Sequence, residues 1–157
     1  MINKKIIIFT DGSCTNNGRS DSEGGIGILF PNKEFNDVSE KFVLNPITNQ
    51  RAELYAILKA IKTVSSKRKG YDIEIYSDSI YTINCCTKWL PTWVENGWKK
   101  ANKKSVLNQD ILSEIYSVMK KHRGDITFKH VKAHARDQSY ETINNNKVDL
   151  LAKNCYK

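Results

Sequence analysis

The chain has 157 residues, of which 39% are hydrophobic and 27% charged, so we expect one packed domain over residues 1–157 rather than a disordered chain. Lysine and arginine outnumber aspartate and glutamate by 25 to 17, and the formal charge of +8 favours a polyanionic partner, most often nucleic acid. Charge alone does not separate nucleic acid from an acidic membrane surface. No apolar run approaches the roughly 20 residues of a membrane span, and the first strand begins too early for a signal peptide.

The four cysteines form no CxxC pair, and no histidine stands at zinc-ligand spacing from any of them. We therefore expect reduced thiols in an intracellular, cytoplasmic protein. Cys14 lies close to Asp11 in the sequence, but no Cys–His arrangement near it favours a catalytic thiol.

The first predicted strand lies in residues 4–9 (KKIIIF), and its run from Ile6 to Phe9 has no polar break, which is typical of a central strand buried on both faces. We expect it to end in Thr10-Asp11-Gly12-Ser13, with a turn at Gly12 that leaves Asp11 at the tip of the strand. The alternative is that Asp11 only starts a tight turn, as Asp-Gly often does.

Two further strands, over residues 24–30 and 35–44, follow after short turns and predict an antiparallel meander. From Asn49 the apolar period becomes helical, with Thr48 or Asn49 as the cap, until about residue 66.

Residues 71–76 (YDIEIY) predict a fourth strand, which ends in Ser77-Asp78-Ser79. A strand, a helix and a strand in succession predict a right-handed crossover with parallel pairing. Asp11 and Asp78 are then expected side by side at the carboxyl ends of two strands, where open α/β sheets bind ligands.

The second half of the chain predicts a short helix over 79–89, a longer helix over 105–122, a strand over 125–131 and a last helix over 147–156. Residues 132–146 are expected to form a long polar loop that holds His134. Asp149 is expected in the first turn of the last helix, where an acidic residue is favourable even without a function.

The segment 89–104, WLPTWVENGWKKANKK, contains all three tryptophans and is interrupted by Pro91 and Gly97. Trp89 and Trp93 are four residues apart and can share a helix face. Aromatic residues among lysines suit nucleic-acid contacts, whereas the alternative is a small satellite core, which we expect at least for Trp98.

Two neighbouring aspartates repel each other in a dry site unless a divalent cation neutralises them. Glu53, one turn into the first helix, and Asp149 are the further candidate ligands. Four carboxylates without clustered cysteine or histidine favour Mg²⁺ or Mn²⁺ over zinc.

The motifs TDGS at Asp11, TNQRAE at 48–53, SDS at Asp78, KAH at 132–134 and KVDLLAK at 147–153 resemble type 1 ribonuclease H, in the same order from residue 4 to 153. The resemblance implies the α/β RNase H-like fold, with a five-stranded mixed sheet flanked by helices. It also implies a monomeric endonuclease that hydrolyses the RNA strand of RNA–DNA hybrids. Two Mg²⁺ ions, or Mn²⁺ in their place, would serve the reaction, leaving 5′-phosphate and 3′-hydroxyl ends.

The same resemblance implies roles for individual residues. The metal ligands would be Asp11, Glu53, Asp78 and Asp149. His134 would assist proton transfer or product release. Contacts to the RNA strand would come from Gly12, Asn17, Asn49 and Gln50. Contacts to the DNA strand would come from Thr48, Tyr81, Trp89, Trp93 and Asn108.

The chain also departs from the family pattern. The loop over 135–146 is longer than usual, with Asn145 as the equivalent of a loop asparagine, and Pro46 stands where some relatives have a basic phosphate contact. We expect no separate hybrid-binding domain. The alternative functions are another nuclease or a recombinase of the same superfold, a non-catalytic hybrid-binding module, and a basic structural domain.

Overall fold

The computed structural model describes residues 4–17, 19–100 and 106–155. One five-stranded sheet has the order β3-β2-β1-β4-β5. The strands are β1 (Lys5–Thr15), β2 (Glu23–Leu29), β3 (Val38–Phe42), β4 (Asp72–Ser77) and β5 (Ile126–His130). The helices are α1 (Asn49–Lys67), α2 (Ile80–Asn84), the π-helical turn η1 (Cys85–Trp89), α3 (Leu90–Glu95), α4 (Gln109–Lys121) and α5 (Tyr140–Asn154).

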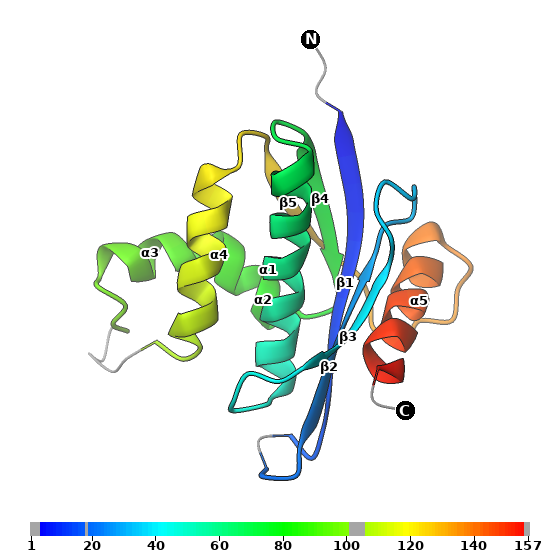
Figure 1. Ribbon diagram of the computed structural model, residues 1–157, viewed down its shortest axis with the longest axis horizontal. Helices are drawn as coiled ribbons and strands as arrows, with labels where there is room; N and C mark the ends of the chain where they lie inside the picture. The colour runs from blue at the N-terminus through cyan, green and yellow to red at the C-terminus, as the bar shows by residue number, and fades with distance from the viewer. Residues whose placement is uncertain (1–3, 18, 101–105, 156–157) are drawn as a thin grey trace.

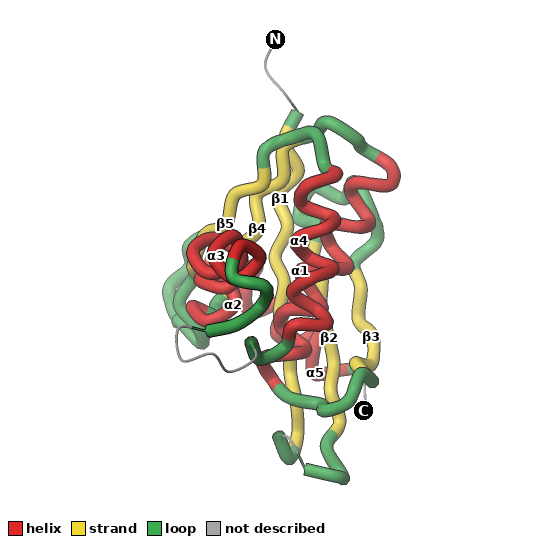
Figure 2. The backbone as a smooth tube through the Cα atoms, turned by 90° about the vertical axis from the view of Figure 1, so that its left-hand side faces the viewer, coloured by secondary structure: helices red, strands yellow, loops and turns green. Residues whose placement is uncertain are grey.

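The pairing of the strands confirms the predicted mixed sheet. β1, β2 and β3 form an antiparallel meander, while β4 pairs in parallel with both β1 and β5. Helices α1 and α4 pack together on one face of the sheet, and α5 covers the other face (Figures 1 and 2). Within the described residues, no helix is both long and apolar enough to cross a membrane.

Each face of the sheet has its own core. Alternate residues of the central strands, such as Ile6, Ile8 and Ile75, are fully buried against the apolar side of α1. On the opposite face, Phe9 stacks on Tyr76 with 4.6 Å between ring centroids, and both pack against Val148 of α5. The two cores hold β1 and β4 rigidly from both sides, as the unbroken apolar run of β1 predicts.

The predicted end of the first strand is wrong. β1 continues through Thr10-Asp11-Gly12-Ser13 to Thr15, although its pairing with β4 stops at Phe9. Gly12 makes no turn, because it pairs with Ile26 of β2. A Cβ atom at position 12 would lie 2.6 Å from the carbonyl carbon of Ala52. The glycine is therefore required by the close approach of α1 to β1.

The predicted loop over 132–146 is also wrong, because α5 begins at Tyr140. The hydroxyl of Ser139 accepts a hydrogen bond from the Thr142 amide and caps the helix. Asp149 therefore lies well inside α5 rather than in its first turn. The helix packs tightly on the sheet because Gly27 of β2 has no side chain, and a Cβ there would lie 2.5 Å from the Val148 carbonyl oxygen.

Smaller differences concern the ends of elements. The third strand is shorter than predicted, and α4 begins at Gln109 rather than at Ser105, which lies outside the described residues. Pro91 does not interrupt the tryptophan-rich segment, because it lies in the first turn of α3, where proline is tolerated. The chain thus runs from α2 through η1 into α3, and this helical stretch ends before Gly97, which has a positive φ. The last lysines of the segment lie outside the described residues.

We predict that Gly12→Ala destabilises the protein by about 3 kcal/mol, because the new methyl group must push the start of α1 away from β1. Gly97→Ala is the control. The φ of +65° at Gly97 is unfavourable for alanine, but a Cβ atom there would meet no atom within 4 Å beyond its chain neighbours. We therefore expect a loss of about 1 kcal/mol in the free energy of unfolding. Urea unfolding measures both, and equal losses would contradict the close approach.

Candidate metal centre

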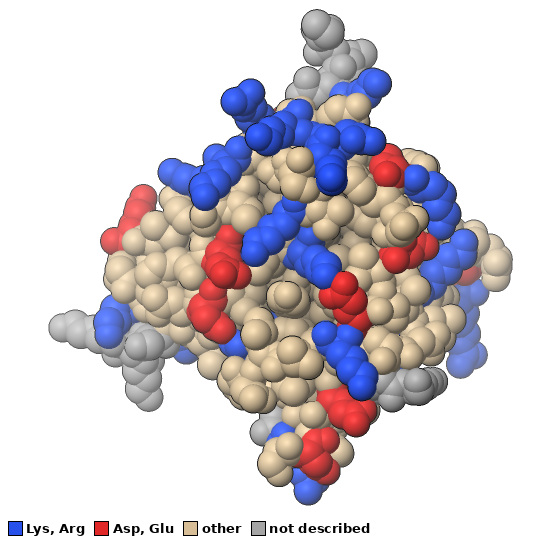
Figure 3. All heavy atoms as spheres, in the orientation of Figure 1, with Lys and Arg blue, Asp and Glu red and all other residues tan. Residues whose placement is uncertain are grey.

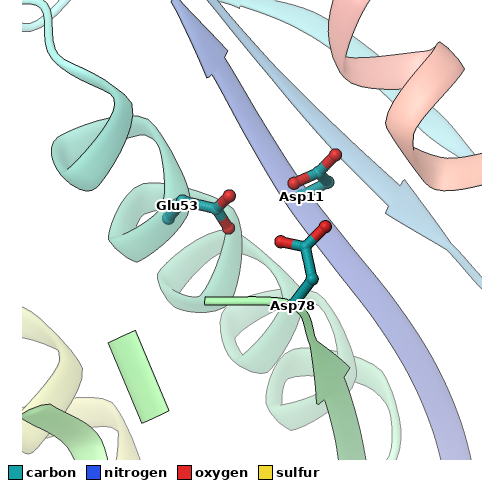
Figure 4. A group of neighbouring side chains, drawn as sticks. All are labelled: Asp11, Glu53 and Asp78. Carbon is teal, nitrogen blue, oxygen red and sulfur yellow. The ribbon is translucent and has the colours of Figure 1, made fainter. Parts of the chain in front are cut away.

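Three carboxylates from three different elements meet beside the middle of β1 (Figure 4). Asp11 comes from β1, Glu53 from α1, and Asp78 from the turn after β4. One oxygen of each lies within 4.8 Å of the others. Asp11 is 3% and Glu53 8% exposed, whereas Asp78 is half-buried. The predicted meeting of these three residues is therefore confirmed.

The first turn of α1 orients Glu53. The side-chain oxygen of Thr48 accepts a hydrogen bond of 3.1 Å from the Arg51 amide, so the helix begins at Asn49 and places Glu53 just beyond its first turn. Because Gly12 lets this turn approach β1, the Glu53 carboxylate reaches Asp11.

Asp78 is held by the turn between β4 and α2. The Ser77 hydroxyl accepts from the Ser79 amide at 3.1 Å, and the Ser79 hydroxyl caps α2 by accepting from the Thr82 amide. Asn145 of α5 donates its side-chain N–H to one Asp78 oxygen at 3.3 Å. Asn145, which the sequence places in a loop, therefore lies in α5.

Burial sets the protonation of the group. Loss of solvent raises the pKa of Asp11 to about 8, and the Asp78 charge adds to this effect. Burial also raises the pKa of Glu53 well above its ordinary value, with a further contribution from the Asp11 charge. Without a cation, Asp11 and Glu53 therefore hold protons near neutral pH.

The donors fit a hard divalent cation. Glu53 Oε2 is buried without a hydrogen-bond partner, which is costly unless something else binds this oxygen. The three residues offer only carboxylate oxygens, the ligands that Mg²⁺ and Mn²⁺ prefer. A bound cation would also remove the repulsion among the three charges.

The carboxylates open into a cleft of about 580 Å³. His134 and Asp149 lie on its wall, with His134 in an exposed loop after β5. Asp149 is not part of the close group of three. Its carboxylate instead accepts a hydrogen bond of 3.0 Å from Lys153, one helical turn away. Lys153 is a residue that the sequence analysis missed, although the spacing of four was visible.

Two of the four predicted RNA-contacting residues line the same cleft. Gly12 and Asn49 line it, and the Asn17 side-chain oxygen accepts from the Asn49 amide at 2.7 Å. Gln50 is exposed on the first turn of α1. Asn49 and the Gly12 backbone thus lie in the same cleft as the carboxylates.

A second, apolar pocket of about 400 Å³ contains three of the predicted DNA-contacting residues. Trp89 and Trp93 lie 5.7 Å apart between ring centroids, which confirms their shared face, and Tyr81 lies 6.2 Å from Trp89. Lys100 and Leu107 complete the lining. Trp98 is partly buried against the main core, rather than in the separate satellite core that the sequence predicts.

Arg51 connects the residues around these two pockets, and the sequence analysis did not single it out. Its buried guanidinium donates to both oxygens of Asp110 on α4, at 2.8 and 2.7 Å, and to the Asn108 side-chain oxygen at 3.4 Å. Asn108 in turn donates to the Tyr81 hydroxyl at 3.1 Å. The pair stabilises the negative form of Asp110 and lowers its pKa. Thr48 and Asn108 are thereby placed on adjoining helix starts.

Comparison with known proteins gives one consistent family. The family model described as RNase H matches residues 3–157. The ribonuclease H of Syntrophomonas wolfei is 37% identical, covering 98% of this chain and 97% of the relative. The solution structure of the PFV RNase H domain is 25% identical with a TM-score of 0.76, covering 98% of this chain and 94% of that one.

A foamy viral protease-reverse transcriptase, solved with an RNA/DNA hybrid, has a TM-score of 0.77 at 22% identity and shares the fold. The match covers 96% of this chain but 20% of that longer protein.

We predict that the protein in EDTA loses stability as the pH rises from about 4 to 8. Asp11 binds its proton more tightly in the folded chain, with a pKa of about 8 against an ordinary 3.8, so its contribution is complete below pH 4 and is lost as the pH rises through 8. Asp11→Asn should reduce this fall by more than about 1 kcal/mol.

Urea unfolding at pH 5 and pH 8 measures the effect, with Asp21→Asn in an exposed turn as the matched control. The control should lose as much stability between pH 5 and pH 8 as the unmodified protein does. An identical pH dependence in the Asp11 variant would show that Asp11 carries no raised pKa.

Proposed function

This chain belongs to the ribonuclease H family, metal-dependent nucleases that hydrolyse the RNA of RNA–DNA hybrids, and we propose that it cuts the RNA strand internally by a two-metal-ion reaction. The products would carry 5′-phosphate and 3′-hydroxyl ends. The observation that carries this proposal is the meeting of Asp11, Glu53 and Asp78 around a buried oxygen without a partner.

The carboxylates are proposed to bind two Mg²⁺ ions, or Mn²⁺ in their place. Asp11, Glu53 and Asp78 would form the common group, and Asp149 would join it from α5 after its carboxylate leaves Lys153. Bound ions would supply charge stabilisation at the scissile phosphate, activation of the attacking water, and stabilisation of the leaving 3′ oxygen. The rigid elements that carry the ligands hold them in place for this chemistry.

His134 is proposed to move a proton at the edge of the cleft. Its ring is exposed and lies on the cleft wall with Asp149, so it can take up or release a proton where water and product enter. This position suits assistance to the 3′ leaving oxygen or to product release.

The two pockets are proposed to select the hybrid. The amide groups of Asn17, Asn49 and Gln50, together with the Gly12 backbone, would contact the RNA strand, where 2′-hydroxyl groups distinguish RNA from DNA. Thr48, Asn108, Tyr81, Trp89 and Trp93 would contact the DNA strand. Flat aromatic surfaces beside a lysine suit sugars and bases of that strand.

An enzymatic function is favoured over that of a non-catalytic hybrid-binding module. A module that only binds has no need of three close carboxylates, of which the buried Asp11 and Glu53 destabilise the folded chain when charged unless a cation neutralises them. We propose that one copy of the chain suffices, because Asp11, Glu53, Asp78, His134 and Asp149 all come from the same chain.

We predict that the protein with Mg²⁺ cuts the RNA of a labelled hybrid at internal positions and leaves single-stranded RNA, duplex RNA and duplex DNA intact. Asp11→Asn should lower the rate at least about a thousandfold, because several kcal/mol of charge stabilisation is lost. Asp21→Asn is the matched control and should cut normally.

End-labelling of the products tests for the 5′-phosphate, and EDTA should abolish cleavage. The metal assignment fails if Asp11→Asn cuts at the normal rate. Hybrid binding without cleavage in Mg²⁺ or Mn²⁺ would instead support the binding-module alternative.

A further inference from the structure

A strongly basic surface lies at the end of the molecule remote from the metal centre. Figure 3 shows lysine and arginine gathered at the end where β1 begins and where α1 and α4 end (compare Figure 1). We call it the distal basic surface, and its seven residues are Lys4, Lys67, Arg68, Lys69, Lys120, Lys121 and Arg123. The active cleft and the tryptophan pocket include none of them.

Backbone contacts bring together the three segments that carry these residues. The Lys4 carbonyl oxygen accepts from the Asp72 amide at 2.8 Å, and the Arg68 carbonyl oxygen accepts from the Tyr71 amide at 3.2 Å. A ring nitrogen of His122 donates to the Tyr71 carbonyl oxygen at 2.6 Å. The cations are therefore part of one fixed surface, although they lie far apart in the sequence.

Attraction to helix carboxyl ends explains only some of this charge. Lys67, Lys120 and Lys121 lie in the last turns of α1 and α4, where cations are favourable. Lys69 and Arg123 lie beyond those helices. None of the seven cations forms an ion pair within 4.0 Å with another part of the chain that the structure describes. Their charge is thus available to an external anion.

Aromatic rings accompany the cations. Lys4 lies over the ring of Tyr71 at 5.9 Å, Arg68 over Phe35 at 5.6 Å and Lys120 over Tyr116 at 5.4 Å. Phe35, Tyr71 and Tyr116 are themselves half-buried residues at the surface. Cations that follow a backbone, together with rings on which bases stack, are typical of surfaces that bind single-stranded nucleic acid.

The separation from the cleft decides which part of a substrate could reach this surface. The 19 residues of α1 separate Thr48 at its start from the distal basic surface, which is about 28 Å at 1.5 Å per residue. A stiff hybrid that crosses the start of α1 does not also cover its far end. A flexible single strand leaving the hybrid can follow the side of the molecule.

We propose that the distal basic surface binds a single-stranded extension of the hybrid that occupies the cleft. This inference rests on the proposed function, since it takes the hybrid as the substrate. The surface would favour hybrids with an unpaired RNA or DNA tail over blunt hybrids.

The test compares KM and kcat for a blunt hybrid and for the same hybrid with a 5′ or 3′ tail of about 16 nucleotides, the upper site size of single-strand-binding surfaces. We expect one tail polarity to lower KM about tenfold at low salt and to leave kcat unchanged. Lys69→Gln/Arg123→Gln should lose this gain. Lys41→Gln/Lys147→Gln, which removes two exposed charges elsewhere, should keep it.

Fluorescence anisotropy with the free tail strand in EDTA gives a readout that does not depend on cleavage. The Lys69/Arg123 variant should show a salt slope smaller by about 1.4, because about 0.7 is lost for each single-strand phosphate contact. The inference is overturned if neither tail lowers KM, or if both double variants lose the gain equally. Absence of cleavage for every hybrid would count against the proposed function, and the anisotropy result would then decide the inference alone.

Discussion

Repulsion among three close carboxylates, two of them buried, is the constraint around which this structure is arranged. Asp11, Glu53 and Asp78 come within 4.8 Å of one another although burial raises the pKa of both Asp11 and Glu53. Such a group persists only when the surrounding elements are rigid enough to hold it. The cores on the two faces of the sheet provide this rigidity by fixing β1, β4 and the start of α1, and the absence of a side chain at Gly12 allows the approach.

The distribution of charge follows from the same constraint. The cleft concentrates carboxylates that attract divalent cations, while cations and aromatic residues are placed around it and at the far end of α1. A nucleic acid is repelled by the bare cleft and attracted by the rest of the surface. Metal binding would therefore reverse the local charge at the point where the phosphate must lie. Arg51 links the cleft to the tryptophan pocket, because it connects the start of α1 to Asp110 and Asn108 at the start of α4.

The antiparallel meander, the parallel pairing of β1 with β4 and the start of α1 could be predicted, because apolar periodicity and local capping are recorded in short stretches of sequence. The five-stranded sheet as a whole and the site shared by Asp11, Glu53 and Asp78 were implied by the resemblance of the motifs to ribonuclease H. The end of β1 could not, since Asp-Gly is equally compatible with a turn and with a strand that another backbone approaches closely. The start of α5 was missed because three successive asparagines disfavour a helix, whereas contacts such as that of Asn145 with Asp78 offset this preference. The Arg51–Asp110 pair joins residues 59 apart, which no local pattern reveals.

The buried carboxylates of Asp11 and Glu53 hold protons until a divalent cation binds and displaces those protons. Calorimetric titration of Mg²⁺ at pH 7, in buffers that differ in ionisation enthalpy, measures the protons exchanged on binding. With a pKa of about 8 for Asp11 in the metal-free chain, the account predicts net proton release into the buffer. Mg²⁺ binding with a heat that is the same in every buffer would mean that no proton leaves, and would contradict the account.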